Sequence, residues 1–353
     1  MNDVSAYEAH PADPPHAPHP VHPAHPVHPG FARMFTPGRL TLGLFLPLWP
    51  YSGDMKAMTG QAEVIERADA SPLSALWVRD VPLYDPGFGD VGQVYDPWTY
   101  LAWLAAHTRR LSLAAGSAVF TLRHPIDLAK QSASIDQLSG GRLVLGAASG
   151  DRGSEFPAYG IDHAARAERY REAFHWFREL TQNTAPHLSS ALGRMGGGLD
   201  VLPKPVTGRI PLLVTGSSRQ KPEWIAEQAD GWLIHPGSPN SVAGTGALGR
   251  KVAAWRQLIP GGRFKPVATN EWLDLAEDPR TGPQPLRGGF VLRIGTDALI
   301  EHLHRWQELG VNHAALGVQH GRRPAADAVA QLIEEVAPHF PALAGPEPQA
   351  PAW

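Results

Sequence analysis

Short apolar segments of strand length alternate along this chain with longer segments of helical periodicity. The short segments are almost continuously apolar, as in parallel strands that are buried on both faces. The longer ones repeat apolar residues at i, i+4 and i+7, as Tyr170, Phe174 and Phe177 do. Strands are expected at 41–48, 74–80, 111–119, 142–148, 210–215, 231–235, 266–275 and 313–318. Helices are expected at 61–70, 98–107, 125–138, 164–181, 223–229, 248–258, 297–309 and 325–336.

Eight strand–helix units in series predict an α/β protein. The number favours a closed (β/α)8 TIM barrel over an open doubly wound sheet. Two segments, 183–208 and 277–289, are too long for ordinary connections and are expected to be inserted loops that shape a ligand pocket. We therefore expect one barrel domain at 37–345 and a flexible C-terminus at 346–353.

Residues 1–36 differ in composition from the rest of the chain. Eight prolines and six histidines fall between His10 and Pro29, with almost no aliphatic side chain to bury. Such a segment is expected to be a disordered or polyproline-like tail. Histidines recur at every third position from His16 to His28, about 9 Å apart in a polyproline helix. That spacing favours a solvated tail over a metal site.

Composition and charge exclude several classes of protein. With 43% hydrophobic and 18% charged residues, the chain is typical of a globular protein, and its net charge of -3 gives no electrostatic argument for nucleic acid or anionic membranes. The chain has no cysteine, which removes disulfides, thiolate nucleophiles and cysteine metal sites, and we expect no metal. No segment approaches 18 continuous apolar residues, and no secretory signal is recognised, so we expect a cytoplasmic protein.

Candidate chemistry lies where the expected strands end, because a barrel builds its ligand site at the carboxyl ends of its strands. Gly216, Ser217 and Ser218 stand between a strand and a helix, where free N–H groups and the helix dipole would hold an anion. Small residues at 114–118 leave room for a flat ring against the backbone. Barrel packing alone would also explain small residues there.

A glycine-rich motif at 244–249 matches the dinucleotide fingerprint G-x-G-x-x-G. A true fingerprint lies in the turn directly after a strand, but residues 236–243 intervene here. We interpret the motif as a flexible loop that leads into a helix.

Several short motifs, in this order and spacing, resemble the bacterial-luciferase-like family of flavin-dependent monooxygenases. The resemblance covers about residues 40–338. The motifs that carry it are Leu76-Trp77-Val78, Leu122-Arg123-His124-Pro125, the segment 136–142, Glu155-Phe156, Gly216-Ser217-Ser218, Ala229-Asp230-Gly231-Trp232 and the segment 309–313.

The resemblance implies a luciferase-like TIM barrel and a set of flavin-binding positions. Relatives hold the flavin phosphate with an arginine after the fourth strand, here Arg166, and with the turn after the fifth strand. The family also carries a non-prolyl cis peptide at the end of the third strand, which would fall near Gly116–Ser117. The expected cofactor-binding residues are Gly116, Ser117, Ser149, Gly150, Arg166, Thr215, Gly216, Ser217 and Ser218.

Two departures from the luciferases argue against light emission. Luciferases carry a catalytic histidine just after the second strand, where Arg79 and Asp80 stand here. They also carry a cysteine and an arginine after the fourth strand, where Ala148 and Ser149 stand here. Asp80 is our candidate catalytic residue, for contact with the substrate or the flavin edge.

The resemblance implies a flavin-dependent oxidoreductase, in the first place a monooxygenase that uses reduced FMN and O2 on a small organic substrate. A separate flavin reductase would supply the reduced FMN, and a homodimer is possible. One alternative is an F420-dependent enzyme that transfers hydride. A non-catalytic flavin-binding protein and a phosphate-handling barrel lyase are further alternatives.

Overall fold

Eight parallel strands form a closed barrel in the part of the chain that the structure describes. The computed structural model describes residues 27–48, 60–85, 87, 95–235 and 242–346. The barrel strands are β1 (Thr41–Phe45), β2 (Ala75–Val78), β3 (Ser112–Val119), β4 (Leu143–Ala148), β7 (Leu212–Thr215), β8 (Gly231–Leu233), β9 (Val267–Leu275) and β12 (His313–Gly317). Their order is β9-β12-β1-β2-β3-β4-β7-β8, and an additional pairing of β9 with β8 closes the sheet.

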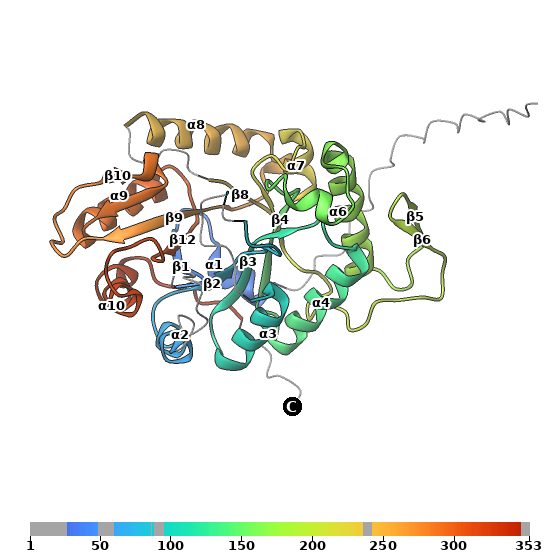
Figure 1. Cartoon of the computed structure of the whole chain (residues 1–353), viewed down its shortest axis with the longest axis horizontal. Coiled ribbons are helices and arrows are strands. Elements are labelled where there is room, and N and C mark those ends of the chain that lie inside the picture. Colours follow the sequence, from blue (N-terminus) through green and yellow to red (C-terminus); the bar gives the residue numbers. More distant parts are fainter. Residues whose placement is uncertain (1–26, 49–59, 86, 88–94, 236–241, 347–353) are drawn as a thin grey trace, which may run out of the picture.

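The helices that connect these strands surround the barrel (Figure 1). They are α2 (Gln61–Asp69), α3 (Pro97–His107), α4 (Pro125–Leu138), α6 (Arg166–Gln182), α7 (Pro222–Gln228), α8 (Val242–Leu258), α9 (Thr296–Glu308) and α10 (Ala325–Gln331), the last continued by a π-helical turn, Leu332–Val336. Helices α3 and α4 each begin with a proline, which fits the first helical turn because its N–H is not needed there. The predicted (β/α)8 fold class is confirmed.

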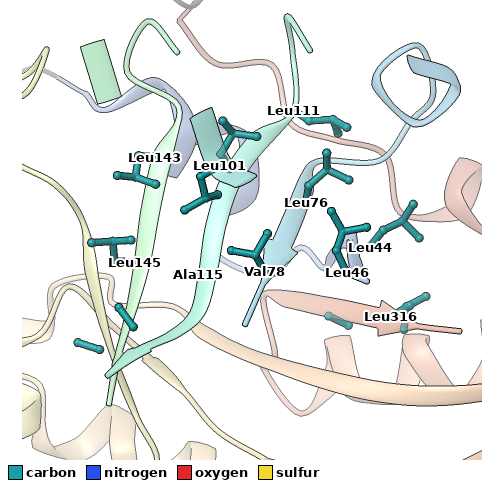
Figure 2. Close-up of a cluster of buried hydrophobic side chains, with 14 of the residues drawn as sticks. Leu44, Leu46, Leu76, Val78, Leu101, Leu111, Ala115, Leu143, Leu145 and Leu316 are labelled. Carbon is teal, nitrogen blue, oxygen red and sulfur yellow. The ribbon is translucent and has the colours of Figure 1, made fainter. Parts of the chain in front are cut away.

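The buried apolar side chains form an outer and an inner layer because successive side chains of a strand point to opposite faces. Figure 2 shows part of the outer layer, in which Leu76, Val78 and Leu143 from the strands meet Leu101 of α3. The inner layer lies within the barrel and consists largely of bulky rings and small residues. Its rings include Phe45, Trp77 and Trp272.

The first described residues fold against the barrel. Helix α1 (Pro29–Met34) begins after His28, whose ring nitrogen Nε2 lies 3.1 Å from Oδ1 of the fully buried Asp136. Met34 and Phe35 are buried in the inner layer of the barrel. The prediction of a disordered tail at 1–36 is therefore wrong for residues 28–36. The side chains of Met34 and Phe35 supply the apolar surface that the histidine–proline repeat lacks. Residues 1–26 lie outside the described part.

The two inserted segments contain strands that the sequence pattern did not predict. Strands β5 (Leu188–Ser190) and β6 (Gly193–Met195) form an antiparallel hairpin in the first segment. Strand β10 (Gln284–Leu286) pairs with β11 (Val291–Ile294), which extends the sheet beyond β9. These strands have three or four residues, too few for a period of two to be recognised.

The glycine-rich motif at 244–249 lies within helix α8. Our interpretation of these residues as a flexible loop is therefore wrong. A phosphate-binding fingerprint needs its glycines in the turn between strand and helix, so the helical position also argues against a dinucleotide site. No helix among the described residues is long and apolar enough to cross a membrane.

Candidate active site

All ten residues proposed from the sequence line one cavity at the carboxyl ends of the barrel strands. The cavity has a volume of about 500 Å³, within the range of small-molecule sites. It lies at the ends of β2, β3, β4 and β7 and beside the first turn of α6. The sequence-predicted residues in its lining are Asp80, Gly116, Ser117, Ser149, Gly150, Arg166, Thr215, Gly216, Ser217 and Ser218. The cavity is also lined by residues that were not among the expected cofactor-binding or catalytic residues, namely Arg79, Val81, Val119, Ala148, Asp151, Arg152, His163 and Arg219.

The peptide bond between Gly116 and Ser117 is cis, as the resemblance implied. A Cβ atom on Gly116 would lie 2.8 Å from Cε3 of Trp77 and 3.2 Å from Cζ of Phe45. Glycine is therefore needed at 116, because these two rings already occupy the space beneath it. The two rings thus lie beneath the cis peptide, whose residues line the cavity, and we call Phe45 and Trp77 the slot floor.

Trp77 is held in place by a polar group at the centre of the barrel. Its indole Nε1–H donates to Nε2 of His313 at 2.8 Å, and Nδ1 of the same imidazole lies 2.8 Å from Oγ1 of Thr41. Nε2 accepts, so the hydrogen-bond pattern assigns the imidazole hydrogen to Nδ1. Burial lowers the pKa of His313 to about 3. The imidazole therefore stays neutral and keeps accepting from Trp77 at neutral pH.

Ser117 links the slot to the turn after β7. Its Oγ lies 2.5 Å from Oγ1 of Thr215, so the ends of β3 and β7 are joined by one hydrogen bond. A Cβ atom on Gly146 would lie 2.9 Å from the same Oγ of Ser117. Because Gly146 of β4 has no side chain, the hydroxyl of Ser117 fits beside it.

The turn after β7 offers fewer free amide groups than the sequence analysis expected. The N–H of Gly216 donates to the carbonyl of Leu233 at 2.8 Å, and the N–H of Ser218 donates to that of Thr215 at 3.1 Å. The N–H of Arg219 donates to Oγ of Ser217 at 3.2 Å. Helix α7 begins only at Pro222, so its N-terminus does not follow the turn directly. Any anion here would depend mainly on side chains.

Arginines supply positive charge to the cavity. Arg79, Arg152, Arg166 and Arg219 line it, against the two carboxylates of Asp80 and Asp151.

Two buried nitrogens near the start of α6 are unpaired. Nε of Arg166 and Nε2 of His163 have no hydrogen-bond partner among the described residues, although Nη1 of Arg166 donates to the carbonyl of His163 at 2.7 Å. Both residues line the cavity. An unpaired buried polar atom is costly, and an anionic ligand would accept from Nε of Arg166 and from Nε2 of His163 when that nitrogen carries the imidazole hydrogen. This end of the cavity therefore fits a phosphate-bearing ligand.

Asp80 is held by the protein and does not present a free carboxylate. Oδ1 accepts from Nη2 of Arg123 at 2.7 Å, while Oδ2 accepts from Nε of the same arginine at 3.1 Å and from the N–H of Val119 at 2.9 Å. Burial opposes the charge of Arg123, but the hydrogen bond and attraction to Asp80 prevail and raise its pKa above the ordinary value. This geometry argues that Asp80 positions the end of β3, and a direct catalytic role stays a prediction.

Glu155 is a buried acid near the cavity that sequence reasoning did not select. It lies in the short helix α5 (Glu155–Ala158), is 2% exposed, and its Oε1 has no hydrogen-bond partner in the described ranges. Burial raises its pKa to about 6, although the charge of Arg152 opposes the shift. The Glu155 carboxyl beside Arg152 therefore gains or loses its negative charge close to neutral pH. The quoted Glu155-Phe156 motif was the signal that could have found it.

The comparison with protein families agrees with this geometry. The family model described as luciferase-like monooxygenase matches residues 40–269. The chain belongs to the luciferase-like monooxygenase family. Among curated relatives, an uncharacterized protein of Mycobacterium tuberculosis is 34% identical over 142 residues, which are 40% of this chain and 50% of that protein. The chain thus spans about half the length of the curated relative that it matches.

Solved structures share the luciferase-like barrel over most of the chain. The monooxygenase RslO1 from Streptomyces bottropensis has a TM-score of 0.70 and 20% identity, covering 85% of this chain and 99% of that one. An F420-dependent secondary alcohol dehydrogenase, solved with an F420–acetone adduct, has a TM-score of 0.67 and 16% identity over 86% and 99% of the two chains. The oxygenating constituent of 3,6-diketocamphane monooxygenase from Pseudomonas putida was solved with FMN. Its TM-score is 0.66 and its identity 14%, covering 85% of this chain and 98% of that one. At these identities the likeness shows the fold alone.

Proposed function

We propose that the chain is a flavin-dependent oxidoreductase, in the first place a monooxygenase that acts on a small organic substrate with reduced FMN and O2. One observation carries the proposal. The cis peptide at Gly116–Ser117, above the rings of the slot floor, and an arginine-rich end beside Arg166 line the same cavity. FMN has a planar ring system at one end and a phosphate at the other, so the cavity matches it in shape and charge.

The protein side of this function is binding, orientation and exclusion of water. The ring system would lie over the slot floor, and the hydroxyl pair of Ser117 and Thr215 would stand at its edge. The phosphate would take the unpaired donors of Arg166 and His163, with Arg219 at the rim. Bound FMN supplies the redox chemistry and the activation of O2. A separate flavin reductase would deliver it reduced, and the homodimer also belongs to this proposal.

Hydride transfer with F420 is the second candidate. The neighbour that is F420-dependent has nearly the same TM-score as the one solved with FMN. Arg219 is exposed at the edge of the cavity, where a longer anionic tail would reach it. A titration against both cofactors separates the two candidates.

Cofactor binding is the first prediction and tests the function. Arg166→Ala should weaken FMN binding at least tenfold, because a guanidinium–phosphate contact is lost from a partly buried site. The measurement is a fluorescence titration of the purified protein with FMN and, separately, with F420. Arg280→Ala is the matched control, since the Arg280 side chain is 85% exposed and lies outside the cavity lining.

The outcomes of that titration distinguish the candidates. FMN binding that depends on Arg166 supports the flavin enzyme, whereas tighter binding of F420 favours hydride transfer. Oxygen consumption with reduced FMN and a broad substrate panel then separates an enzyme from a non-catalytic flavin-binding protein. If the wild-type chain binds neither cofactor, the proposal fails.

A further inference from the structure

Three aromatic side chains form a cluster near the carboxyl ends of β9 and β12, across the barrel from the slot. Trp272 of β9, Phe290 just before β11 and His320 after β12 contact one another, with ring centroids 5.2 to 6.1 Å apart. We call these three residues the aromatic wall. In the closed order of strands, β9 stands four positions from β3 and β12 four positions from β4. The wall therefore faces the ends of the two strands that carry the slot.

Trp272 of the aromatic wall contacts both a residue of the cavity lining and a residue of the slot floor. The guanidinium carbon of Arg79, a cavity-lining residue, lies 5.9 Å from the ring centroid of Trp272. Trp272 also packs on Phe45 of the slot floor, with centroids 4.9 Å apart. One continuous set of rings thus runs from beneath the cis peptide to the opposite side of the mouth.

A buried amide at the wall has no hydrogen-bond partner among the residues that the structure describes. Gln319 is 3% exposed, and neither Oε1 nor Nε2 forms a hydrogen bond within the described part of the chain. The amide stands close to Trp272: a Cβ built on Gly317 would lie 2.8 Å from Oε1 of Gln319 and 2.2 Å from Cε3 of Trp272. Burying a donor and an acceptor without partners destabilises a protein, so such a group is a candidate for ligand recognition.

We propose that the aromatic wall and Gln319 form the substrate site, and that they select a planar aromatic or conjugated compound that carries a hydroxyl or carbonyl group. This inference rests on the proposed flavin function, because the slot opposite is assigned there to the cofactor. Ring faces and edges on the wall suit a flat substrate. The amide of Gln319 can both donate to a carbonyl oxygen and accept from a hydroxyl, so it would recognise either group.

Matched probes test the two parts of the site separately. 2-Naphthol carries a planar ring and a hydroxyl, naphthalene has the ring alone, and 2-decalol has the hydroxyl on a saturated ring. Saturation-transfer NMR titrations measure their affinity for the flavin-free protein. Wild type should bind 2-naphthol about tenfold more tightly than naphthalene, the difference expected for one buried hydrogen bond. It should bind 2-decalol more weakly than 2-naphthol.

The variant Gln319→Leu removes the amide and keeps the volume. It should lower the affinity for 2-naphthol about tenfold and leave that for naphthalene unchanged. Phe290→Leu, at the half-buried edge of the wall, should weaken both aromatic probes. The matched control Gln284→Leu, on the exposed strand β10, should change neither.

Thermal unfolding of the ligand-free variants separates recognition from a structural role. If Gln319 serves a ligand, Gln319→Leu should have a Tm equal to or above that of wild type, because an unpaired amide has been replaced by an apolar group. A structural amide would instead lower the Tm. Absence of 2-naphthol binding, an equal loss for both aromatic probes in Gln319→Leu, or a lowered Tm would each overturn the inference.

An FMN titration of the same samples keeps this inference distinct from the proposed function. If the protein binds FMN but binds 2-naphthol, naphthalene and 2-decalol equally well, the substrate site is overturned and the flavin assignment remains intact. Discrimination without FMN binding supports the aromatic site and overturns the flavin assignment.

Discussion

Arg142 shows what a single residue does in this fold and why its role was not evident in the sequence. The side chain is 3% exposed and its five N–H groups donate to five oxygens, at 2.7 to 3.2 Å. The acceptors belong to Ala105 and Thr108 at the end of α3, Leu111 just before β3, and Ser139 just after α4. Desolvation lowers the pKa of Arg142 to about 10, which still leaves it charged at neutral pH. The motif around Arg142 was recognised, but not its function of joining these elements.

Arg142→Lys should therefore be strongly destabilising although it keeps the charge. A lysine has three donors, so at least two of the five acceptors would lose their partner in a buried site. We expect a loss of about 2–4 kcal/mol in the free energy of unfolding, measured by urea denaturation. Arg110→Lys, on an exposed side chain of the same connection, is the control and should cost less than about 0.5 kcal/mol. Equal stabilities would show that the five contacts contribute little.

At the scale of elements, helix α1 closes the end of the barrel where the strands begin. The carbonyl of Gly30 accepts from Oγ of Ser112, the first residue of β3, and Oγ1 of Thr41, the first residue of β1, donates to the carbonyl of Met34. Figure 1 shows α1 within the ring of strands. The composition of residues 1–36 as a whole concealed this helix, because the six histidines and eight prolines outweighed the short apolar segment that follows them.

His28→Ala should loosen that closure. Nδ1 of His28 accepts from the N–H of Phe31 at the start of α1, and its Nε2 lies 3.1 Å from Oδ1 of Asp136, whose Oδ2 accepts from the N–H of Val206. Removing the imidazole loses a helix cap and one partner of a buried carboxylate, so we expect about 1–3 kcal/mol of destabilisation. Hydrogen exchange should report it first in α1 and at the start of β3. His187→Ala, in the first inserted segment, is the control. Unchanged exchange in α1 would contradict the role of His28.

At the scale of the whole molecule, the sequence predicted the eight barrel strands and their helices, because each has a clear apolar period. The resemblance added the cis peptide and the lining of the cavity at residues such as Ser149 and Arg166. Neither the apolar pattern nor the resemblance predicted the hydrogen-bond partners of the site residues. Capture of Asp80 by Arg123 and the bond from the N–H of Gly216 to the carbonyl of Leu233 join residues far apart in sequence, which no local pattern encodes.

The stability of the protein should depend on pH through Glu271 of β9. This side chain is 4% exposed, and among the described residues only Oε1 has a hydrogen-bond partner, the N–H of Trp272 at 3.2 Å. Burial raises the pKa of Glu271 to about 8, against about 4.3 in an unfolded chain. Across that interval the folded protein binds more protons than the unfolded one, so this group makes the protein less stable as the pH rises from about 4 to 8.

Glu271→Gln should remove that part of the pH profile. The amide keeps an acceptor for Trp272 and cannot ionise, so the variant should match wild type near pH 4.5 and exceed it increasingly toward pH 8.5. Urea denaturation across this range measures the difference, which should reach a few kcal/mol at the alkaline end. Glu277→Gln, which alters an exposed carboxyl just beyond the same strand, should follow the wild-type profile. If the stabilities of wild type and Glu271→Gln change with pH in parallel, Glu271 is already ionised in the folded protein. The aromatic wall then has a negative charge next to Trp272.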